Sequence, residues 1–270
     1  MVSLTRKVAL ITGASTGIGR ATAFAFRAAG ARVALAARSS EALASLAEEL
    51  GGPDWAIAIP TDVSDSDQCE RFVAEAVAHF GRADVLVNNA GMIVSGLFEH
   101  LEPGDAERQM QVNFFGALYC TRAALPHLKA SRGVIINVSS VAGLLGTPTT
   151  SVYSASKAAM NAWSRALRVE LKPHGVDVVT VCPYFTSGVQ LAQKGILRKG
   201  SLHNRPGQRR QAPGTQTADQ VAQAILRAAQ RPSRIVVLSW AGKLIWRIDR
   251  LAPWLVDWVM IKGLAKLSQK

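Results

Sequence analysis

Short apolar runs alternate with longer helical segments along most of this chain, and no other feature constrains its fold as strongly. Each run has the length of a buried strand, and each intervening segment repeats apolar residues with helical spacing. The predicted strands cover residues 8–11, 32–37, 55–59, 84–87, 133–138, 176–181 and 232–238. Strands that are separated by helices form parallel sheets with helices on both faces. The sequence therefore predicts an α/β fold with one parallel sheet of about seven strands.

A glycine-rich turn follows the first predicted strand. Residues 12–19 read Thr-Gly-Ala-Ser-Thr-Gly-Ile-Gly, and a helix is predicted over residues 21–29. Glycines let backbone N–H groups approach a pyrophosphate, and a helix N-terminus adds partial positive charge. The order of strand, turn and helix favours a dinucleotide site over an ordinary turn. The residues predicted to bind the cofactor here are Gly13, Ser15, Thr16, Gly17, Ile18 and Gly19.

The end of the second predicted strand bears on the choice of cofactor. Ala37 is followed by Arg38, and no carboxylate stands where one would bind the ribose of NAD. An arginine suits the 2′-phosphate of NADP through a charge-assisted contact. We therefore expect NADP(H) to be favoured. The alternatives are an Arg38 that is simply exposed at the surface, and a chain that uses NAD(H).

Polar and small residues follow two further strands. Asp62 and Val63 come after the third strand, and the fourth ends in Asn-Asn-Ala-Gly at residues 88–91. The carboxyl ends of parallel strands open onto one crevice, where ligands bind. Amide side chains can lock two strand ends together there, and Ala-Gly admits a flat ring; a tight turn is the alternative. The predicted cofactor contacts in this group are Asp62, Val63, Asn89, Ala90 and Gly91.

A second group of residues carries acid–base chemistry. Tyr153 and Lys157 are four residues apart, which places both on one face of a helix predicted over residues 153–171. A nearby ammonium lowers the pKa of a phenol from its usual value of about 10. Ser140, at the end of the fifth strand, can hold a substrate oxygen, so the group predicts proton transfer at a carbonyl or an alcohol. The alternative is a helix that merely exposes a tyrosine and a lysine.

Asn113 stands in an apolar setting within a helical segment predicted over residues 103–128. A buried amide needs hydrogen-bond partners. It either holds a water that leads to Lys157 or only satisfies backbone groups.

Residues 7–189, about two thirds of the chain, resemble the short-chain dehydrogenase/reductase family. The family's glycine pattern T-G-x-x-x-G-I-G, its N-N-A-G element, its active-site pattern Y-x-A-S-K and the spacing of its catalytic serine recur here in the same order. The resemblance implies a single Rossmann-type, doubly wound domain. It also implies that the protein oxidises alcohols or reduces ketones with a nicotinamide cofactor.

The resemblance implies a role for each matching residue. Tyr153 would be the general acid or base, and Lys157 would lower its pKa and bind the nicotinamide ribose. Ser140 would orient the substrate oxygen, and Asn113 would support a proton-relay water. At the other end of the cofactor, the implied contacts are Asp62 and Val63 at the adenine and residues 89–91 beside the ribose.

The stretch after the sixth predicted strand departs from the family pattern. The family commonly has Pro-Gly there, whereas this chain has Pro183 followed by Tyr184. An aromatic residue at this position resembles members that act on retinoids, steroids and other lipid-like substrates, so we expect a bulky apolar alcohol or ketone. Pro183 and Thr186 are expected to contact the cofactor, Thr186 at its carboxamide. We expect the substrate to be enclosed by a loop over residues 188–216 and by side chains near Val94, Leu145 and Tyr184.

The last part of the chain is basic. Residues 1–189 carry 16 basic and 16 acidic residues, whereas residues 190–270 carry 15 basic and 3 acidic residues. We expect residues 1–239 to form the cofactor-binding and catalytic domain, and residues 240–270 to form an amphipathic extension that holds four of the six tryptophans. Tryptophan, leucine and basic residues together fit a helix in a membrane interface, although no run is long enough to span a membrane.

Two alternatives stand beside membrane contact for this extension. It can fold over the pocket, or it can pack against a second subunit. Nucleic-acid binding is not expected, because no recognition motif accompanies the basic charge.

The three cysteines, Cys69, Cys120 and Cys182, are far apart and form no C-x-x-C pair. Their number and spacing argue against a disulfide framework or a metal site and fit a reducing compartment. No signal peptide is expected. We expect a cytoplasmic homo-oligomer, a dimer or tetramer, with membrane-surface contact as an open alternative.

The second functional hypothesis is a nicotinamide-binding scaffold without turnover. The presence of Asn113, Ser140, Tyr153 and Lys157 favours the enzyme. A protein that only binds the cofactor does not need a tyrosine whose pKa is adjusted for proton transfer.

Overall fold

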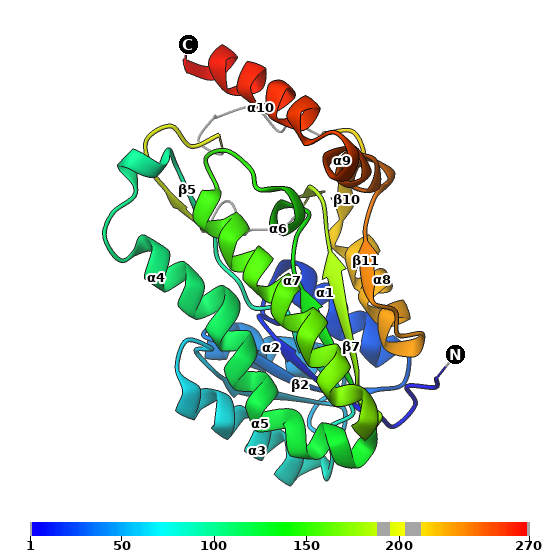
Figure 1. Cartoon of the computed structure of the whole chain (residues 1–270). Coiled ribbons are helices and arrows are strands. Elements are labelled where there is room, and N and C mark those ends of the chain that lie inside the picture. The colour runs from blue at the N-terminus through cyan, green and yellow to red at the C-terminus, as the bar shows by residue number, and fades with distance from the viewer. Residues whose placement is uncertain (1, 188–194, 203–211, 269–270) are drawn as a thin grey trace.

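The computed structural model describes residues 2–187, 195–202 and 212–268 (Figure 1). Its centre is a sheet of seven parallel strands in the order β11-β7-β6-β4-β1-β2-β3. The strands are β1 (Val8–Thr12), β2 (Arg32–Ala37), β3 (Ala56–Pro60), β4 (Val85–Asn88), β6 (Val134–Val138), β7 (Asp177–Cys182) and β11 (Ile235–Val237). Because the order steps outward from β1 in both directions, the sheet is doubly wound. The predicted α/β fold is confirmed.

The last strand is shorter than expected. The apolar run predicted a strand over residues 232–238, but only Ile235–Val237 pair with β7. Pro232 and the two residues after it are exposed, and Pro232 has no N–H to donate to a neighbouring strand.

Helices cover both faces of the sheet (Figure 1). On one face lie α1 (Gly17–Ala28), α2 (Ser40–Glu49) and α8 (Ala218–Gln230), which bury Phe26, Leu43 and Ile225 against the strands. On the other face lie α3 (Ser66–Phe80), α5 (Gly116–Ser131) and α7 (Ser151–Leu171), which bury Phe72, Leu128 and Leu171. The two apolar layers hold every strand in register, and with it the strand ends that form the candidate site.

Local capping signals explain where several helices begin. Asp65 accepts hydrogen bonds from the N–H groups of Asp67 and Gln68 and thereby caps α3. Thr217 and Gln220 form a capping box at the start of α8. The hydroxyl of Ser39 accepts the N–H of Ala42 and caps α2.

The helical segment predicted over residues 103–128 contains an irregular turn. It consists of α4 (Asp105–Met110), the π-helical turn η2 (Gln111–Phe115) and α5, which follow one another without a break. Asn113 lies in the π-helical turn and is fully buried. Such turns inside helices occur frequently at functional sites.

Two short parallel pairs lie outside the central sheet. They join β5 (Val94–Ser95) to β9 (Ile196–Leu197), and β8 (Thr186–Ser187) to β10 (Gln216–Thr217). Arg198 follows β9 and pairs with Asp105 through two hydrogen bonds of 2.9 and 3.0 Å. Residues 195–202 of the expected substrate loop are therefore fastened to the start of α4. Residues 188–194 and 203–211 of that loop lie outside the described residues.

Two helices follow the last strand of the sheet, α9 (Trp240–Leu251) and α10 (Pro253–Ser268). The side chains of Ile245 and Trp246 on α9 belong to an apolar cluster with Val141, Leu145 and Tyr184. None of the helices in the described part of the chain is long and apolar enough to cross a membrane. Three short elements complete the fold, namely η1 (Phe98–His100), α6 (Ala142–Leu145) and η3 (Lys172–His174).

Buried amide side chains tie two central strands to the helices behind them. The Nδ2 of Asn88 on β4 donates to the Oδ1 of Asn137 on β6 at 2.8 Å and to the hydroxyl of Thr121 at 3.0 Å. The Nδ2 of Asn137 donates in turn to the hydroxyl of Ser164 on α7 at 2.8 Å. Asn137 and Ser164 are almost completely buried, so each hydrogen bond replaces one that water would have made.

We expect Asn137→Ala to lower the free energy of unfolding by about 2–6 kcal/mol, because Asn88 and Ser164 each lose a buried partner at about 1–3 kcal/mol apiece. Urea unfolding followed by tryptophan fluorescence measures the loss. Asn161→Ala is the matched control, since the amide of Asn161 makes one hydrogen bond, to the carbonyl of Gly143. Equal losses in the two variants would contradict the importance assigned to the buried amides.

Candidate active site

The candidate site lies at the carboxyl edge of the parallel sheet. The glycine-rich turn follows β1, residues 89–91 follow β4, and Ser140 follows β6. Tyr153 and Lys157 lie in the first two turns of α7, which is packed behind β6 and β7. Segments that are more than a hundred residues apart in the sequence therefore meet at one edge, as the strand ends predicted.

The glycine-rich turn is packed tightly against the end of β4. The Nδ2 of Asn89 donates to the carbonyl of Thr12 at 2.9 Å, and the hydroxyl of Thr12 accepts the N–H groups of Asn89 and Ala90, each at 3.0 Å. A Cβ atom on Gly13 would lie 2.8 Å from the Cα of Ala90, and one on Gly19 would collide with the carbonyl oxygen of Gly13. The amide of Asn89 thus locks two strand ends together, as predicted.

The Lys157 ammonium is held inside the protein. Its side chain is almost completely buried, and its Nζ donates to the carbonyl oxygen of Val138 at 2.9 Å. The same Nζ lies 5.9 Å from the centroid of the Tyr153 ring. A Cβ atom on Gly91 would lie 3.7 Å from this Nζ and 3.3 Å from the Oδ1 of Asn113. Gly91 is therefore next to both polar groups.

Asn113 is satisfied by its neighbours. Its Oδ1 accepts the N–H of Met92 at 2.7 Å, and its Nδ2 donates to the carbonyl of Met92 and to the hydroxyl of Ser156, both at 3.0 Å. These contacts satisfy the buried amide with the backbone of Met92 and the side chain of Ser156. Ser156, which sequence reasoning missed, links Asn113 to α7 directly beside Lys157.

Burial controls the ionisation of Tyr153 and Lys157. Removal from water raises the pKa of the Tyr153 phenol to about 12, although its hydrogen bond to Ser140 acts in the opposite direction. The same removal from water lowers the pKa of the Lys157 ammonium to about 8. The expected lowering of the phenol's pKa by Lys157 is not found, because desolvation dominates the shift and the ammonium lies 5.9 Å from the ring centroid.

Ser140 and Cys182 complete the surroundings of the phenol. The Ser140 hydroxyl accepts the N–H of Ala142 at 3.1 Å and lies close enough to the Tyr153 phenol to act on its pKa. Cys182 ends β7, and burial raises the pKa of its thiol to about 12, partly offset by a hydrogen bond with Ser139. The Cys182 thiol is close enough to Lys157 and Tyr153 to act electrostatically on both. The sequence indicated a role for neither Ser139 nor Cys182.

The remaining residues predicted to bind the cofactor are distributed around the same edge. Arg38, directly after β2, is exposed. The carboxylate of Asp62 accepts the N–H and the hydroxyl of Ser64, at 3.0 and 2.6 Å, and Val63 is buried against Gly116. On the far side of the site, the carbonyl of Pro183 accepts the N–H of Val141 at 2.9 Å, and the hydroxyl of Thr186 donates to the carbonyl of Tyr184 at 3.2 Å.

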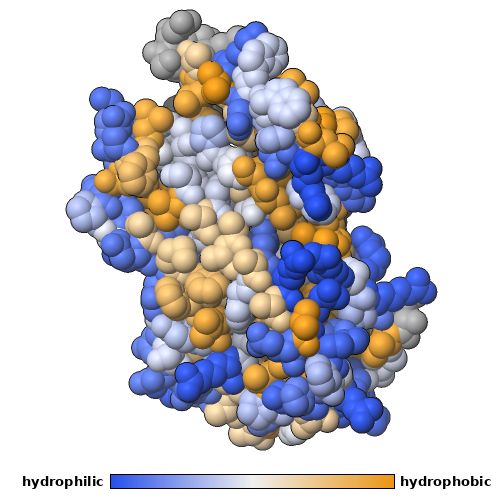
Figure 2. Space-filling view, in the orientation of Figure 1, coloured by the Kyte–Doolittle hydropathy of each residue, from blue (hydrophilic) through white to orange (hydrophobic). Residues whose placement is uncertain are grey.

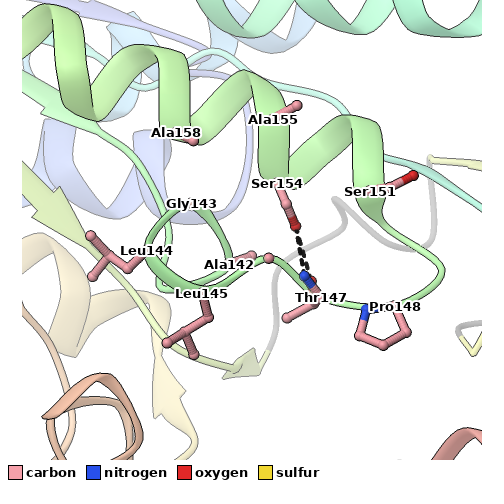
Figure 3. A pocket seen from close by; sticks show the side chains of 11 residues that line it. Ala142, Gly143, Leu144, Leu145, Thr147, Pro148, Ser151, Ser154, Ala155 and Ala158 are labelled. Carbon is pink, nitrogen blue, oxygen red and sulfur yellow. Dashed lines mark hydrogen bonds between the residues drawn. The ribbon is translucent and has the colours of Figure 1, made fainter. Parts of the chain in front are cut away.

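A cavity of about 600 Å³ lies beside the candidate site (Figure 3). Its walls are α6, the connection from Gly146 to Pro148, and small side chains at the start of α7. The N–H of Thr147 donates to the hydroxyl of Ser154 at 3.1 Å and holds the connection against α7 (Figure 3). Leu145, expected near the substrate, lines this cavity, whereas Tyr153 does not. The cavity therefore adjoins the acid–base group without containing it.

Comparisons with known proteins agree with this arrangement. The family model described as short chain dehydrogenase matches residues 7–196. An Arabidopsis thaliana protein named 11-beta-hydroxysteroid dehydrogenase-like 2 is 36% identical over 263 residues, which cover 96% of this chain and 82% of that protein.

Two solved structures are also similar. A short-chain dehydrogenase/reductase from Burkholderia phymatum in complex with NAD gives a TM-score of 0.81 at 27% identity and covers 94% of this chain and 96% of its own. A short chain dehydrogenase from Burkholderia cenocepacia in complex with NADP gives a TM-score of 0.80 at 26% identity and covers 96% and 99%.

The lowered pKa of Lys157 makes a prediction about stability. Between about pH 8 and pH 10 the folded chain has released the Lys157 proton, whereas the unfolded chain, whose lysine pKa is 10.5, still holds it. Unfolding then takes up a proton, so the stability of the wild type relative to Lys157→Met should rise with pH in this window, by at most about 1.4 kcal/mol per pH unit. Urea unfolding of both proteins at a series of pH values measures the difference, with Lys172→Met, at an exposed lysine, as the control. Curves for the wild type and Lys157→Met that run parallel from pH 7 to pH 10 would contradict the assigned pKa.

Proposed function

Because this chain belongs to the short-chain dehydrogenase/reductase family, whose members are oxidoreductases acting on CH–OH groups with NAD(P), we propose that it uses NADP(H) and a bulky apolar substrate. The reaction is hydride transfer between the nicotinamide and the carbinol or carbonyl carbon of a secondary alcohol or ketone. One observation carries the proposal. The Tyr153 phenol lies near enough to the Ser140 hydroxyl for that hydroxyl to act on its pKa. The buried Nζ of Lys157 lies 5.9 Å from the centroid of the Tyr153 ring and next to Gly91.

The start of α1 is suited to the cofactor's pyrophosphate. Within the described residues, Thr16 makes no side-chain cap, and the first turn of α1 carries no acidic residue. The first N–H groups of the helix and their partial positive charge therefore remain available to an anion. Side chains at Gly13 and Gly19 would collide with Ala90 and with the turn itself, so only glycines let the turn close tightly at the start of α1. Residues 13–19, Asp62, Val63 and 89–91 would line the adenosine half of the cofactor.

The chain's own residues manage the proton. When bound, the nicotinamide supplies or accepts the hydride. With a pKa of about 12, the Tyr153 phenol is protonated at neutral pH and is ready to donate to the oxygen of a ketone that is becoming an alkoxide. Ser140 holds the same oxygen through its hydroxyl. Lys157, with a pKa of about 8, is charged at pH 7 and stabilises the phenolate left behind.

The reverse reaction uses the same groups in the opposite sense, with the phenolate accepting the proton of an alcohol. Asn113 holds Met92 and Ser156 in place beside Lys157, and in this proposal it also supports a proton-relay water. Lys157 would in addition hold the nicotinamide ribose, and Pro183 and Thr186 would hold the nicotinamide end.

The preference for NADP(H) rests on Arg38. Its guanidinium is exposed directly after β2, at the crevice side of the sheet, and the described chain contains no ion pair that engages it. A 2′-phosphate would supply the missing anion. NAD(H) is the second candidate, because one similar structure contains NAD and another contains NADP.

The substrate class rests on apolar side chains around the acid–base group. Tyr184 and Leu145 belong to one apolar cluster, and Val94 is buried in β5 under β9. The named relatives include an 11-beta-hydroxysteroid dehydrogenase-like protein, and its name fits a bulky apolar alcohol or ketone.

We also propose that the protein forms a homo-oligomer, either a dimer or a tetramer, in the cytoplasm. Residues 240–270 would make peripheral contact with a membrane.

Tyr153→Phe tests the proposed acid–base role. Removing the hydroxyl should lower kcat for an apolar ketone by about 10²–10⁴-fold, because general acid assistance is worth that much. A panel of apolar ketones with NADPH, followed by absorbance, measures kcat, and quenching of tryptophan fluorescence measures cofactor binding, which should be retained. Turnover at the wild-type rate with the cofactor fully bound would overturn the assignment.

Arg38→Asp tests the cofactor preference. The carboxylate repels a 2′-phosphate and accepts the hydroxyl of an unphosphorylated ribose, so the ratio of kcat/KM for NADPH over NADH should fall by at least about tenfold. Arg20→Asp, at an exposed arginine that pairs with Glu49 on α2, is the control and should leave the ratio unchanged. An unaltered ratio in Arg38→Asp would favour NAD(H) or a cofactor bound without this arginine.

A further inference from the structure

The two C-terminal helices present most of the apolar surface that the chain exposes. Among the described residues, eight of the fourteen exposed large hydrophobic side chains lie between residues 240 and 261. They include Leu251, Trp254 and Ile261, which are 81%, 69% and 67% exposed. These eight side chains are called here the C-terminal face, and they are Trp240, Leu244, Leu251, Trp254, Leu255, Trp258, Val259 and Ile261. Such an area on a folded chain marks a contact with a partner or a membrane.

The C-terminal face is held firmly on the catalytic domain. The opposite side of α9 is packed through Ile245 and Trp246 onto the cluster that contains Val141 and Tyr184. Val256 of α10 is buried, and the side of α10 that carries Met260 and Leu264 faces Gly146 and Pro148 across a small cavity. Both helices therefore have an inner side that packs on residues close to the candidate active site, and an outer side that has no described partner.

Positive charge is interleaved with the exposed apolar side chains. Lys243, Arg247, Arg250 and Lys262 are exposed on α9 and α10. Residues 240–270 carry six basic residues and two acidic ones, Asp249 and Asp257. The Nζ of Lys262 lies 3.7 Å from the ring centroid of Trp258, so an aromatic ring and a cation share one site at the surface. Figure 2 shows hydrophobic and strongly hydrophilic side chains next to each other at the end of the molecule formed by these helices.

We propose that the C-terminal face docks on an anionic lipid surface, with α9 and α10 lying in the plane of the headgroups. Tryptophan and leucine enter the boundary of the acyl chains, and the basic side chains pair with anionic headgroups. The face is poorly suited to a second copy of itself. A symmetric contact would gather the basic residues of both copies in one interface, with only two acids from each copy to offset them.

Docking in this way brings residues that are expected near the substrate close to the lipid. Tyr184, two residues beyond the end of β7, packs under α9, and the connection from Gly146 to Pro148 packs under α10. An apolar alcohol or ketone dissolved in the bilayer would then reach the site without crossing water. This part of the inference rests on the proposed function, whereas the docking itself does not.

Vesicle binding tests the proposal on the full chain. Sedimentation with phosphatidylcholine vesicles, with and without phosphatidylglycerol, should show binding that needs the anionic lipid and weakens as salt is raised. Trp254→Ser/Trp258→Ser should lower the partition coefficient at least about tenfold, since each ring loses its apolar burial in the lipid. Arg247→Glu/Arg250→Glu should remove the preference for phosphatidylglycerol.

Matched controls lie on the outer side of α7, away from the C-terminal face. Val169→Ser and Arg165→Glu change an exposed apolar and an exposed basic side chain and should bind vesicles as the wild type does. Absence of binding to anionic vesicles overturns the proposal, and so does binding that neither double variant weakens. A salt-resistant dimer in sedimentation velocity that Trp254→Ser/Trp258→Ser converts to monomer overturns it in favour of a second copy.

Turnover of a water-soluble ketone without vesicles separates this proposal from the proposed function. The tryptophan and arginine double variants should retain the wild-type kcat, because none of the four residues belongs to the acid–base group. Vesicle binding by a wild-type chain that turns over no ketone would leave the docking proposal standing and overturn the proposed function alone.

Discussion

The hydrogen bond between the Lys157 ammonium and the carbonyl of Val138 is the contact on which the candidate site depends. A buried cation is costly unless it has partners, and this one has a backbone oxygen at the end of a central strand. The contact fixes α7 against β6, and it thereby sets the position of Tyr153 relative to Ser140. The buried amides of Asn88 and Asn137 join the ends of β4 and β6 to each other and to α7. Asn113 is hydrogen-bonded to Ser156, the residue before Lys157. The positions of Ser140, Tyr153 and Lys157 are therefore set by the strands of the sheet and by the contacts of α7 with them.

Desolvation sets the pKa values of Tyr153 and Lys157. It raises the pKa of the phenol and lowers the pKa of the lysine, so that at neutral pH the phenol holds its proton and the lysine is still mostly charged. The same burial links the site to the C-terminal helices, because the apolar cluster under α9 includes Cys182 and Val141, the neighbours of the acid–base group. A contact of α9 and α10 with an apolar medium would reach the entrance of the site through this cluster.

The sequence predicted the architecture because the strand and helix signals are local. Apolar runs between helices, the glycine-rich turn, the Asp65 cap and the Thr217–Gln220 capping box all depend on residues within a few positions of each other. The features that it missed depend on distant partners. Arg198 meets Asp105 across 93 residues, and Asn137 meets Ser164 across 27. A polar residue within the apolar run of 134–138 was a visible signal for Asn137, whereas nothing local marked the π-helical turn at Asn113. The pKa of Tyr153 was misjudged because spacing reveals the neighbouring ammonium but not the extent of burial.

The most direct test of the central claim follows the hydride itself. The protein is incubated with an apolar ketone and NADPH that carries deuterium at the transferable C4 position, and the alcohol product is analysed by mass spectrometry. If Ser140, Tyr153 and Lys157 present a carbonyl to a nicotinamide bound along the glycine-rich turn, the deuterium will be found on the carbinol carbon. An alcohol without deuterium, or no alcohol from any ketone of a broad apolar panel although the cofactor is bound, would contradict the claim.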